Sequence, residues 1–394
     1  SQVPVAPGNP GMELDGIRTT QLNPSNHAAL VEFVKNNDYD WVFVGPEVPL
    51  IEGIVDDFAA AGIKAFGPNK AAAQIEGSKD FAKQLMERHD IPTAKYQTFD
   101  DLDRSAAYVR EHGAPIVIKA DGLAAGKGVT VAMDEETAIA ALEDIFVDHR
   151  FGNACAKVVI EDFLEGQEFS LMSFVNGTDF WPMPISQDHK RAYDEDKGPN
   201  TGGMGTYAPA PVMTDEMVKI ATERILKPTI AAMAKEGRPY KGCLYAGLMI
   251  TKEGPKVVEF NARFGDPETE VVLPRLKSDI VDIFCAVADG GDATLEWHDF
   301  ATLGIVLASK GYPGSYEKGH EIKGLDRVRG KVYHMGTRME GDRLVTAGGR
   351  VLFVVGEGAT LSEARRHALE DVARIECDNL FHRTDIGHWA LNKR

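Results

Sequence analysis

The sequence predicts an α/β fold with more than one domain. Apolar stretches at 39–45 (YDWVFVG) and 64–68 (KAFGP) alternate with a helix-like stretch at 51–63, as in a parallel, wound sheet. The chain has 394 residues, which is enough for two or three domains and a substantial core. We expect the chain to divide near residues 77 and 298.

The middle of the chain also mixes helices and strands. A helix at 78–92 begins with a serine cap and ends near Pro92. Apolar strands at 114–120 and 157–163 flank a glycine-rich loop and a helix at 134–146. The last third predicts a long helix, three strand regions and a final helix, at 275–291, 302–314, 331–337, 348–358 and 360–375.

Composition narrows the class of protein. The formal net charge is −17, which argues against binding nucleic acid or a membrane surface but leaves room for a small anionic ligand. The four cysteines are scattered without a CxxC pair, as in a cytoplasmic protein with reduced thiols. No apolar run approaches the roughly 20 residues of a membrane span.

The stretch 257–264 (VVEFNARF) looks like a buried strand with a polar side. Glu259, Asn261 and Arg263 alternate with apolar residues, so all three share one face. A carboxylate and an amide oxygen two positions apart suit Mg²⁺, and an arginine there can clamp a carboxylate or phosphate. An edge strand with a solvated polar face is the alternative, which the flanking apolar residues disfavour.

The stretch 116–131 carries glycines and lysines after an apolar strand. Lys119 ends the strand, and Gly122, Gly126, Lys127 and Gly128 follow. Glycines let a backbone approach a ligand, and N–H groups beside a lysine make an anion cradle. The spacing fits neither a Walker A loop nor GxGxxG. A flexible hairpin turn with solvated lysines explains the pattern equally well.

Two polar segments follow. The strand ending at Glu161 leads into Phe163, Leu164 and Glu168, which suit a heterocycle and a ribose diol, although an acidic turn is the simpler explanation. The segment 186–211 is polar and glycine-rich, which indicates a long loop. It includes His189, which we interpret as a solvated hydrogen-bonding residue rather than a catalytic one.

These motifs together resemble the ATP-grasp superfamily and, within it, the phosphoribosylamine–glycine ligase family. The resemblance implies an ATP-grasp fold with a Rossmann-like N-terminal parallel-sheet domain and a small C-terminal α/β domain. It rests on four stretches that occur in family order, 44–79, 119–129, 186–205 and 263–270. The implied domains are 1–77, 78–298 with a lid subdomain at about 96–167, and 299–394.

The resemblance also implies roles for residues in the nucleotide site. Lys79 and Lys119 match the two lysines that contact ATP. The stretch from Glu161 to Leu164 matches the adenine hinge, which contains Phe163, and Glu168 matches the ribose acid. Residues 121–128 would form a lid over the phosphates.

Further roles concern the metal and the acyl group. Glu259 and Asn261 match the metal pair, for Mg²⁺ or Mn²⁺. Arg263 and Lys119 would stabilise the transferred group, and Asp188 would bind the amino group of glycine. The strand predicted at 244–250 carries no carboxylate, so a second Mg²⁺ would be held mainly by Glu259, Asn261 and phosphate oxygens.

The N-terminus departs from the family pattern. The family opens with a strand and a GNGGREHA-type loop, whereas Ser1–Val5 runs almost directly into 5–12 (VAPGNPGM). If the protein lacks those elements, we expect its parallel sheet and its amine-substrate site to be impaired, and the ATP site to be affected less.

The implied activity is ATP-dependent ligation of glycine to 5-phosphoribosylamine, in purine biosynthesis, by a cytoplasmic monomer or homodimer. Three alternatives remain open: another ATP-grasp carboxylate ligase or carboxylase, a non-catalytic nucleotide-binding module, and one part of a multifunctional purine enzyme. The retained lysines and metal pair disfavour the non-catalytic module.

Overall fold

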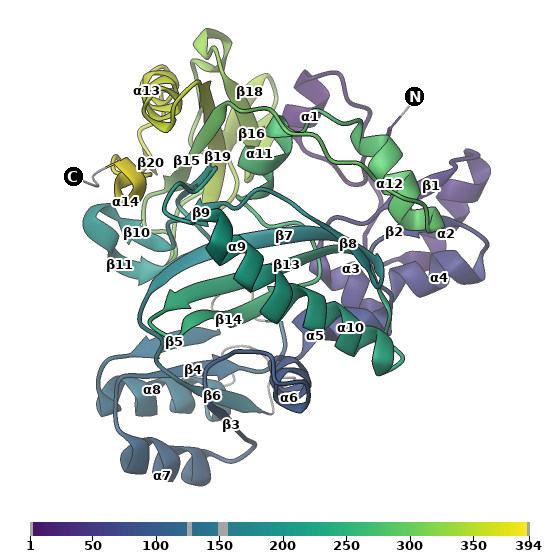
Figure 1. The fold of residues 1–394 in the computed structure, drawn as a ribbon. Coiled ribbons are helices and arrows are strands. Elements are labelled where there is room, and N and C mark those ends of the chain that lie inside the picture. Colours follow the sequence, from purple (N-terminus) through teal and green to yellow (C-terminus); the bar gives the residue numbers. More distant parts are fainter. Residues whose placement is uncertain (1–2, 124–127, 149–156, 392–394) are drawn as a thin grey trace.

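The computed structural model describes residues 3–123, 128–148 and 157–391 (Figure 1). Along the chain come an N-terminal region, a small sheet with two helices, a larger central sheet, and a C-terminal sheet. This confirms the mixed α/β class. No described helix is both long and apolar enough to cross a bilayer.

The N-terminal region holds a two-stranded parallel sheet. β1 (Trp41–Phe43) pairs in parallel with β2 (Lys64–Phe66), as the strand–helix alternation predicted. The single helix predicted at 51–63 was wrong, because Gly53 adopts a φ of +101° and separates two helices. The helices here are α1 (Pro10–Leu14), α2 (His27–Asn36), α3 (Glu47–Glu52), α4 (Ile54–Ala60) and α5 (Lys70–Gly77).

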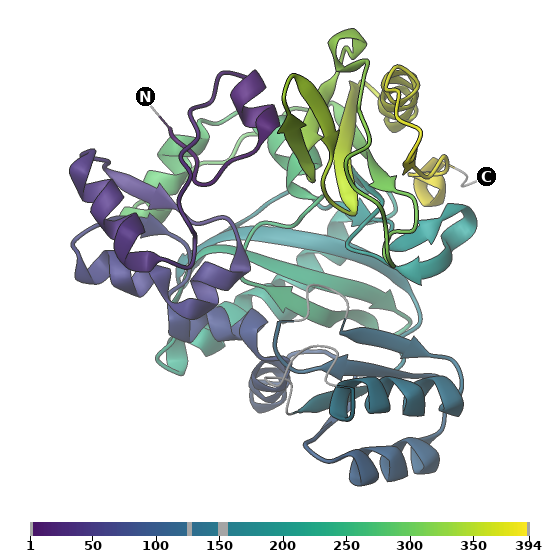
Figure 2. The same cartoon turned by 180° about the vertical axis from the view of Figure 1, so that it is seen from behind.

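The small sheet follows α6 (Lys79–Arg88), whose first turn is capped by the Ser78 side chain as predicted. Its strand order is β3-β6-β4-β5, and α7 (Leu102–His112) and α8 (Glu135–Phe146) cover the face remote from the central sheet in both views (Figures 1 and 2). A separate apolar core fills the space between helices and sheet. The strands are β3 (Tyr96–Phe99), β4 (Ile116–Ala120), β5 (Val129–Ala132) and β6 (Val158–Asp162).

The central sheet is antiparallel, in the order β14-β13-β7-β8. A long helical segment crosses one face of it (Figure 1) and contains a π-helical turn at Thr222–Leu226 between α9 (Asp215–Ala221) and α10 (Lys227–Lys235). The strands are β7 (Gln167–Gly177), β8 (Asp179–Pro182), β13 (Tyr240–Thr251) and β14 (Gly254–Asn261). β14 is an edge strand, so its outer side is available to other elements.

The C-terminal sheet draws strands from two distant parts of the chain. Its order is β16-β19-β15-β12-β9, with β20 beside β15, and α13 (Leu361–Val372) packs on it. β12 (Gly205–Ala208) and β9 (Gln187–Asp188) come from the segment predicted as a loop at 186–211, so that prediction was wrong. The other strands are β15 (Ala301–Ser309), β16 (Lys331–His334), β19 (Arg350–Gly358) and β20 (Leu380–Phe381).

Backbone pairing explains the ordering of this segment. β12 lies between β9 and β15 and hydrogen-bonds to both, so its glycine lies inside a ladder. Between β9 and β12 the chain forms a short hairpin of β10 (Arg191–Tyr193) and β11 (Lys197–Asn200), joined by a 3₁₀ turn at Asp194–Asp196.

The helix predicted at 275–291 is shorter than expected. α12 runs over Ile280–Asp289, and the Asp279 side chain caps its first turn. Before it, Leu276 forms a β-bridge with Trp297, and the Lys277 N–H donates to the Glu296 carbonyl oxygen at 2.8 Å. The remaining short elements are α11 (Thr269–Val272), the 3₁₀ turns Leu273–Arg275 and Leu325–Arg327, the hairpin of β17 (Thr337–Glu340) and β18 (Arg343–Thr346), and α14 (His388–Leu391).

Candidate active site

The polar strand face predicted from the sequence lies at the end of β14. Phe260 and Ala262 are buried on one side. Glu259, Asn261 and Arg263 lie on the other and are partly exposed. The predicted alternation is confirmed, and its polar side is open to a ligand.

A β-bulge brings the main chain of β14 into the same region. The pairing of β13 with β14 shifts between Gly247 and Leu248, and Val258 is the extra residue. The Lys119 ammonium group, at the end of β4, donates to the Val258 carbonyl oxygen at 2.9 Å. This bond joins the small sheet to the central sheet.

A buried ion cluster lies beside this bond. The Glu161 carboxylate on β6 is 2.8 Å from the Lys119 ammonium nitrogen and 3.0 Å from that of Lys83 on α6. All three residues are at most 4% exposed. Burial lowers the pKa of Lys83 to about 8, although Glu161 opposes the shift. Two cationic groups sharing one carboxylate leave positive charge that suits an anionic ligand.

Lys83 was not among the predicted site residues. A signal was present, because Lys83 lies four positions after Lys79, on the same face of one helix. Its ammonium group also donates to the Thr93 hydroxyl at 2.8 Å. Lys83 is thereby held in place by two neighbouring segments.

Lys79 lies in the first turn of α6, close to the glycine-rich loop. Its N–H donates to the Asp121 carboxylate at 2.7 Å, and its ammonium group donates to the Gly122 carbonyl oxygen at 2.9 Å. The Ser78 hydroxyl also donates to Asp121. Asp121 therefore fixes the start of the loop to the helix terminus.

The rest of that loop is only partly described. Gly122 has a φ of +93°, a conformation that glycine adopts without strain, and Gly128 is buried. Gly126 and Lys127 lie outside the described residues.

The predicted adenine hinge follows β6. Phe163 and Leu164 are half-buried just beyond the strand, where their backbone can meet a ligand edge. The Asp162 N–H is already engaged with the Lys95 carbonyl oxygen at 2.9 Å. Glu161 faces the lysines, so the hinge and the ion cluster are parts of one strand end.

A small pocket brings together three acidic residues, Glu168, Asp188 and Glu259. The Lys190 ammonium nitrogen lies 3.2 Å from Asp188. Burial raises the pKa of Asp188 to about 7 despite this partner. The pocket is lined by Glu168, Phe169, Ser170, Asp188, Lys190, Tyr245, Gly247, Val258 and Glu259.

Charge favours an ionised Glu259. Burial alone would raise its pKa, but Lys190, Lys119 and other nearby cations outweigh it and hold the pKa below its usual range. Glu259 is thus a carboxylate rather than a carboxylic acid at neutral pH. An ionised carboxylate is what a hard cation requires.

A second buried carboxylate supports this pocket from behind. Glu268 is 2% exposed and accepts hydrogen bonds from the Tyr245 hydroxyl at 2.9 Å and the Ser170 hydroxyl at 3.1 Å. It belongs to the motif RFGDPETE, yet sequence reasoning did not select it. Its role is visible only once β7 and β13 lie beside it.

Arg263 turns toward the N-terminal region. Its Nε donates to Glu47 at 3.3 Å, and its Nη2 lies 3.6 Å from Glu76. Burial raises the pKa of Glu76 to about 7, while Arg263 and the Ala262 N–H oppose the shift. Arg263 is therefore oriented by carboxylates from two other helices.

The donor set fits Mg²⁺ bound together with a phosphate-bearing ligand. Within the described ranges, no group of three or more His, Cys, Asp or Glu side chains is placed to hold a metal. Glu259 and Asn261 offer two oxygen donors on one partly exposed face. Mg²⁺ commonly takes one or two protein carboxylates and completes its octahedron with waters and substrate phosphates.

His189 differs from its sequence interpretation as a solvated residue. It is fully buried, and its Nε2 accepts a hydrogen bond from the Gly387 N–H at 3.0 Å. Its ring stacks on Trp389 with centroids 3.9 Å apart. The interpretation was wrong because residues near the C-terminus cover this segment.

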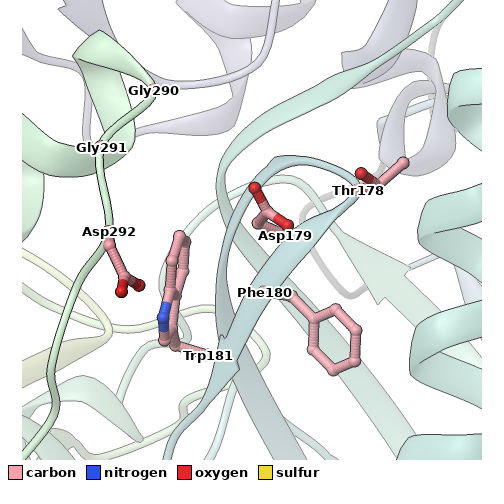
Figure 3. A pocket seen from close by; sticks show the side chains of 7 residues that line it. All are labelled: Thr178, Asp179, Phe180, Trp181, Gly290, Gly291 and Asp292. Carbon is pink, nitrogen blue, oxygen red and sulfur yellow. The ribbon is translucent and has the colours of Figure 1, made fainter.

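A further pocket lies away from all these residues. It has a volume of about 520 Å³ and lies between the turn after β7 and the end of α12 (Figure 3). Figure 3 shows the Trp181 indole near Asp292, with Asp179 on the same strand, β8. None of the predicted site residues lines it, so its size does not identify the chemistry.

The small sheet and the central sheet meet at Lys119, beside the hinge after β6 and the polar face of β14. This arrangement defines the chain as an ATP-grasp protein. The ATP-grasp domain model of phosphoribosylglycinamide synthetase matches residues 77–269, and the models of the N and C domains of the same protein match residues 1–76 and 302–389. The chain belongs to the phosphoribosylglycinamide synthetase family, as the sequence predicted.

Similar proteins agree. A protein named phosphoribosylamine–glycine ligase from Halalkalibacterium halodurans is 54% identical over 395 residues, covering 100% of this chain and 92% of the relative. Its counterpart from Salmonella typhi is 51% identical, with coverages of 99% and 92%. The crystal structure of the Thermotoga maritima phosphoribosylamine–glycine ligase superposes with a TM-score of 0.85 at 33% identity, covering 98% and 93%.

A more distant structure shares the fold alone. The biotin carboxylase domain of Hydrogenobacter thermophilus 2-oxoglutarate carboxylase, solved with MgADP, has a TM-score of 0.70 at 15% identity. It covers 93% of this chain and 82% of that chain.

Proposed function

We propose that this chain joins glycine to 5-phosphoribosylamine at the expense of ATP, giving glycinamide ribonucleotide, ADP and phosphate in purine biosynthesis. Family membership and the names of its relatives support this assignment. The observation that carries it is the polar face of β14 beside the Lys83–Glu161–Lys119 cluster, which offers positive charge and metal ligands to a triphosphate.

The chemistry explains the need for ATP. A carboxylate is anionic and does not react directly with an amine at neutral pH. A glycine carboxylate oxygen attacks the γ-phosphorus, ADP leaves, and glycyl phosphate forms. The amine nitrogen then attacks the acyl carbon, loses a proton, and releases phosphate. The first step depends mainly on positioning and charge neutralisation.

The nucleotide is bound between the two sheets. Lys79 and Lys119 contact its phosphates, and the backbone around Phe163 and Leu164 meets the adenine. Glu161 fixes Lys119, and Glu168 accepts hydrogen bonds from the ribose. The predicted lid, residues 121–128 with Gly122, Gly126, Lys127 and Gly128, would exclude water from the acyl phosphate.

The acyl-transfer side uses the other polar residues. Glu259 and Asn261 would hold Mg²⁺ or Mn²⁺, which when bound offsets the triphosphate charge. Arg263 stabilises oxygens of the transferred group. Asp188 binds the glycine ammonium group, because its pocket adjoins Glu259 and its carboxylate is buried.

The proposed organisation follows the sequence divisions. Residues 1–77 form the N-terminal domain, 78–298 the ATP-grasp domain with its lid at about 96–167, and 299–394 the C-terminal domain. The protein acts in the cytoplasm on small molecules, as a monomer or homodimer.

The direct test is ADP release with ATP, Mg²⁺ and glycine, with and without freshly prepared phosphoribosylamine. We expect turnover only with both substrates, and a glycine amide as product. ADP release driven by formate or bicarbonate in place of glycine would instead indicate another ATP-grasp ligase or a carboxylase. ATP binding with no turnover under any of these conditions would favour a nucleotide-binding module.

A further inference from the structure

The short segment 187–191 has two sides with different surroundings. Asp188 and Lys190 line the pocket beside Glu259. His189, between them, points the opposite way into the protein. Its N–H and carbonyl groups are paired with Gly205 and Met204, so the backbone of the segment is fixed within the C-terminal sheet.

Residues 383–389 cover the His189 side; we call them the C-terminal clamp. Figures 1 and 2 both show α14, which contains the end of the clamp, beside the β10–β11 hairpin. Gly387 donates its N–H to His189 Nε2 at 3.0 Å, and the Trp389 ring stacks on the imidazole at an angle of 13°. The two partners lie 198 and 200 positions away from His189 in the chain.

The protonation state of His189 suits this contact. Nε2 accepts a hydrogen bond, so the ring carries its proton on Nδ1, which faces Asp196 at 3.7 Å. Burial lowers the pKa of His189 to about 4, so the ring is neutral at physiological pH. The neutral, stacked imidazole has a packing role rather than the role of an acid or base.

Arg383 extends the clamp to the hairpin. Its side chain is fully buried and donates to Asp385 at 2.8 and 2.9 Å, to Asp196 at 3.0 Å, and to the Arg191 carbonyl oxygen at 3.0 Å. The Trp389 indole N–H also donates to Asp196 at 3.0 Å. These bonds hold the chain immediately after Lys190.

We propose that the C-terminal clamp positions Asp188 and Lys190 for binding glycine, through His189 and the main chain of Arg191. This inference rests on the proposed function, because it assigns glycine to the Asp188 pocket. None of the clamp residues lines the pocket beside Glu259. Their effect is geometric: loosening the strand behind the pocket displaces two charged groups that must meet a small zwitterion.

The test compares Trp389→Ala with Trp389→Phe and with Arg366→Ala, an exposed control on α13 that pairs with Glu370. For each variant we would measure KM for glycine, KM for ATP, kcat and Tm. Trp389→Ala should raise KM for glycine about tenfold or more, since a displacement near 1 Å far from the chemistry can cost up to about a hundredfold. KM for ATP should stay near the wild-type value.

The conservative variant provides the rescue. Trp389→Phe keeps a stacked ring and should restore KM for glycine close to wild type, and Arg366→Ala should change nothing. Equal increases in both KM values, in parallel with a fall in Tm, would show a merely structural role and overturn the proposal. So would an unchanged KM for glycine in Trp389→Ala. If Trp389→Ala does not fold, Arg383→Lys takes its place with the same expectations.

A second readout separates this inference from the proposed function. Amide hydrogen exchange in 187–191 should be faster in Trp389→Ala, while exchange in 257–261 should not change. Wild-type protein without glycine-dependent ADP release would refute the proposed function. Unchanged exchange in 187–191 would refute the clamp whatever the substrate proves to be.

Discussion

Two lysines flank the polar face of β14, and the structure holds them in different ways. Lys119 is 4% exposed, pairs with Glu161 and donates to a main-chain oxygen of β14. The Lys190 side chain is 36% exposed and pairs with Asp188 alone among the ion pairs of the described residues. Lys119 is fixed by two adjoining sheets, and Lys190 by the segment 187–191, which packs on residues 383–389.

The difference teaches how each side responds to a ligand. The Lys119 side carries excess positive charge in a low-dielectric setting before any nucleotide arrives, so it is preorganised for phosphate. The Lys190 side chain is more exposed to water than that of Lys119, but its partner Asp188 is buried and has a pKa raised to about 7, so the charge of this pair depends on pH and on the substrate bound beside it. Changes on the first side should affect folding and catalysis, and changes on the second mainly substrate binding.

The largest effect should come from Glu161→Leu. Lys83 and Lys119 would lose their shared carboxylate inside the protein, which costs about 3–5 kcal/mol when one partner of a buried pair is removed. Urea unfolding measures this loss. The exposed neighbour Glu165→Leu serves as control, and equal stabilities of the two variants would contradict the preorganised cluster.

Replacing Lys119 and Lys190 by methionine, one at a time, tests the difference between the two sides most directly. Lys119→Met should lower kcat by about 10²–10³, the range typical of losing one preorganised donor to transition-state charge. Lys190→Met should lower kcat less and act chiefly on KM for glycine. Steady-state kinetics with each substrate varied separately decide this, and identical kinetic patterns would show that the two sides are equivalent.

Arg263→Lys tests a third way of holding a cation. Glu47 and Glu76 orient the planar guanidinium, and a lysine keeps the charge but not the fork. We expect kcat to fall about tenfold, less than the 10²–10³ of losing a donor outright. Near-normal turnover would refute the role of Arg263 in stabilising the transferred group.

Asp188→Asn should have the smallest effect on kcat, and should act on KM for glycine and on its pH profile. Burial raises the pKa of Asp188 to about 7, so the carboxylate that binds an ammonium group forms as pH rises through 7. Wild-type kcat/KM for glycine should therefore rise from pH 6 to pH 8, in the region of that pKa. The asparagine variant should lack this limb. A limb that persists would assign the titration to another group.

Sequence patterns predicted the features that depend on residues close together in the chain. Ser78 caps α6, and β14 alternates, because each follows from neighbouring residues. Lys83 carried such a signal too, one turn after Lys79, and was overlooked. Lys119, Glu161 and Glu259 could thus be placed on strands before their partners were known, whereas Asp188, predicted in a loop, lies on β9.

Other features could not be predicted because they depend on contacts between residues far apart in the chain. Residues 186–211 read as a loop, but β12 gains its partner from β15, about 100 positions later. His189 appeared solvated because Gly387 and Trp389 cannot be assigned to it from sequence. The single helix at 51–63 failed for a different reason, since only the left-handed conformation of Gly53 reveals the break.

The Val258 bulge has a consequence for how this fold can vary. Lys119 is anchored by a peptide oxygen, and every amino acid at position 258 supplies the same atom. A substitution at position 258 leaves this hydrogen bond to Lys119 intact as long as the bulge persists. Only a backbone change, such as an amide-to-ester replacement that weakens the oxygen as an acceptor, would reach it. This anchor therefore depends on the backbone conformation of the strand and not on the amino acid at position 258.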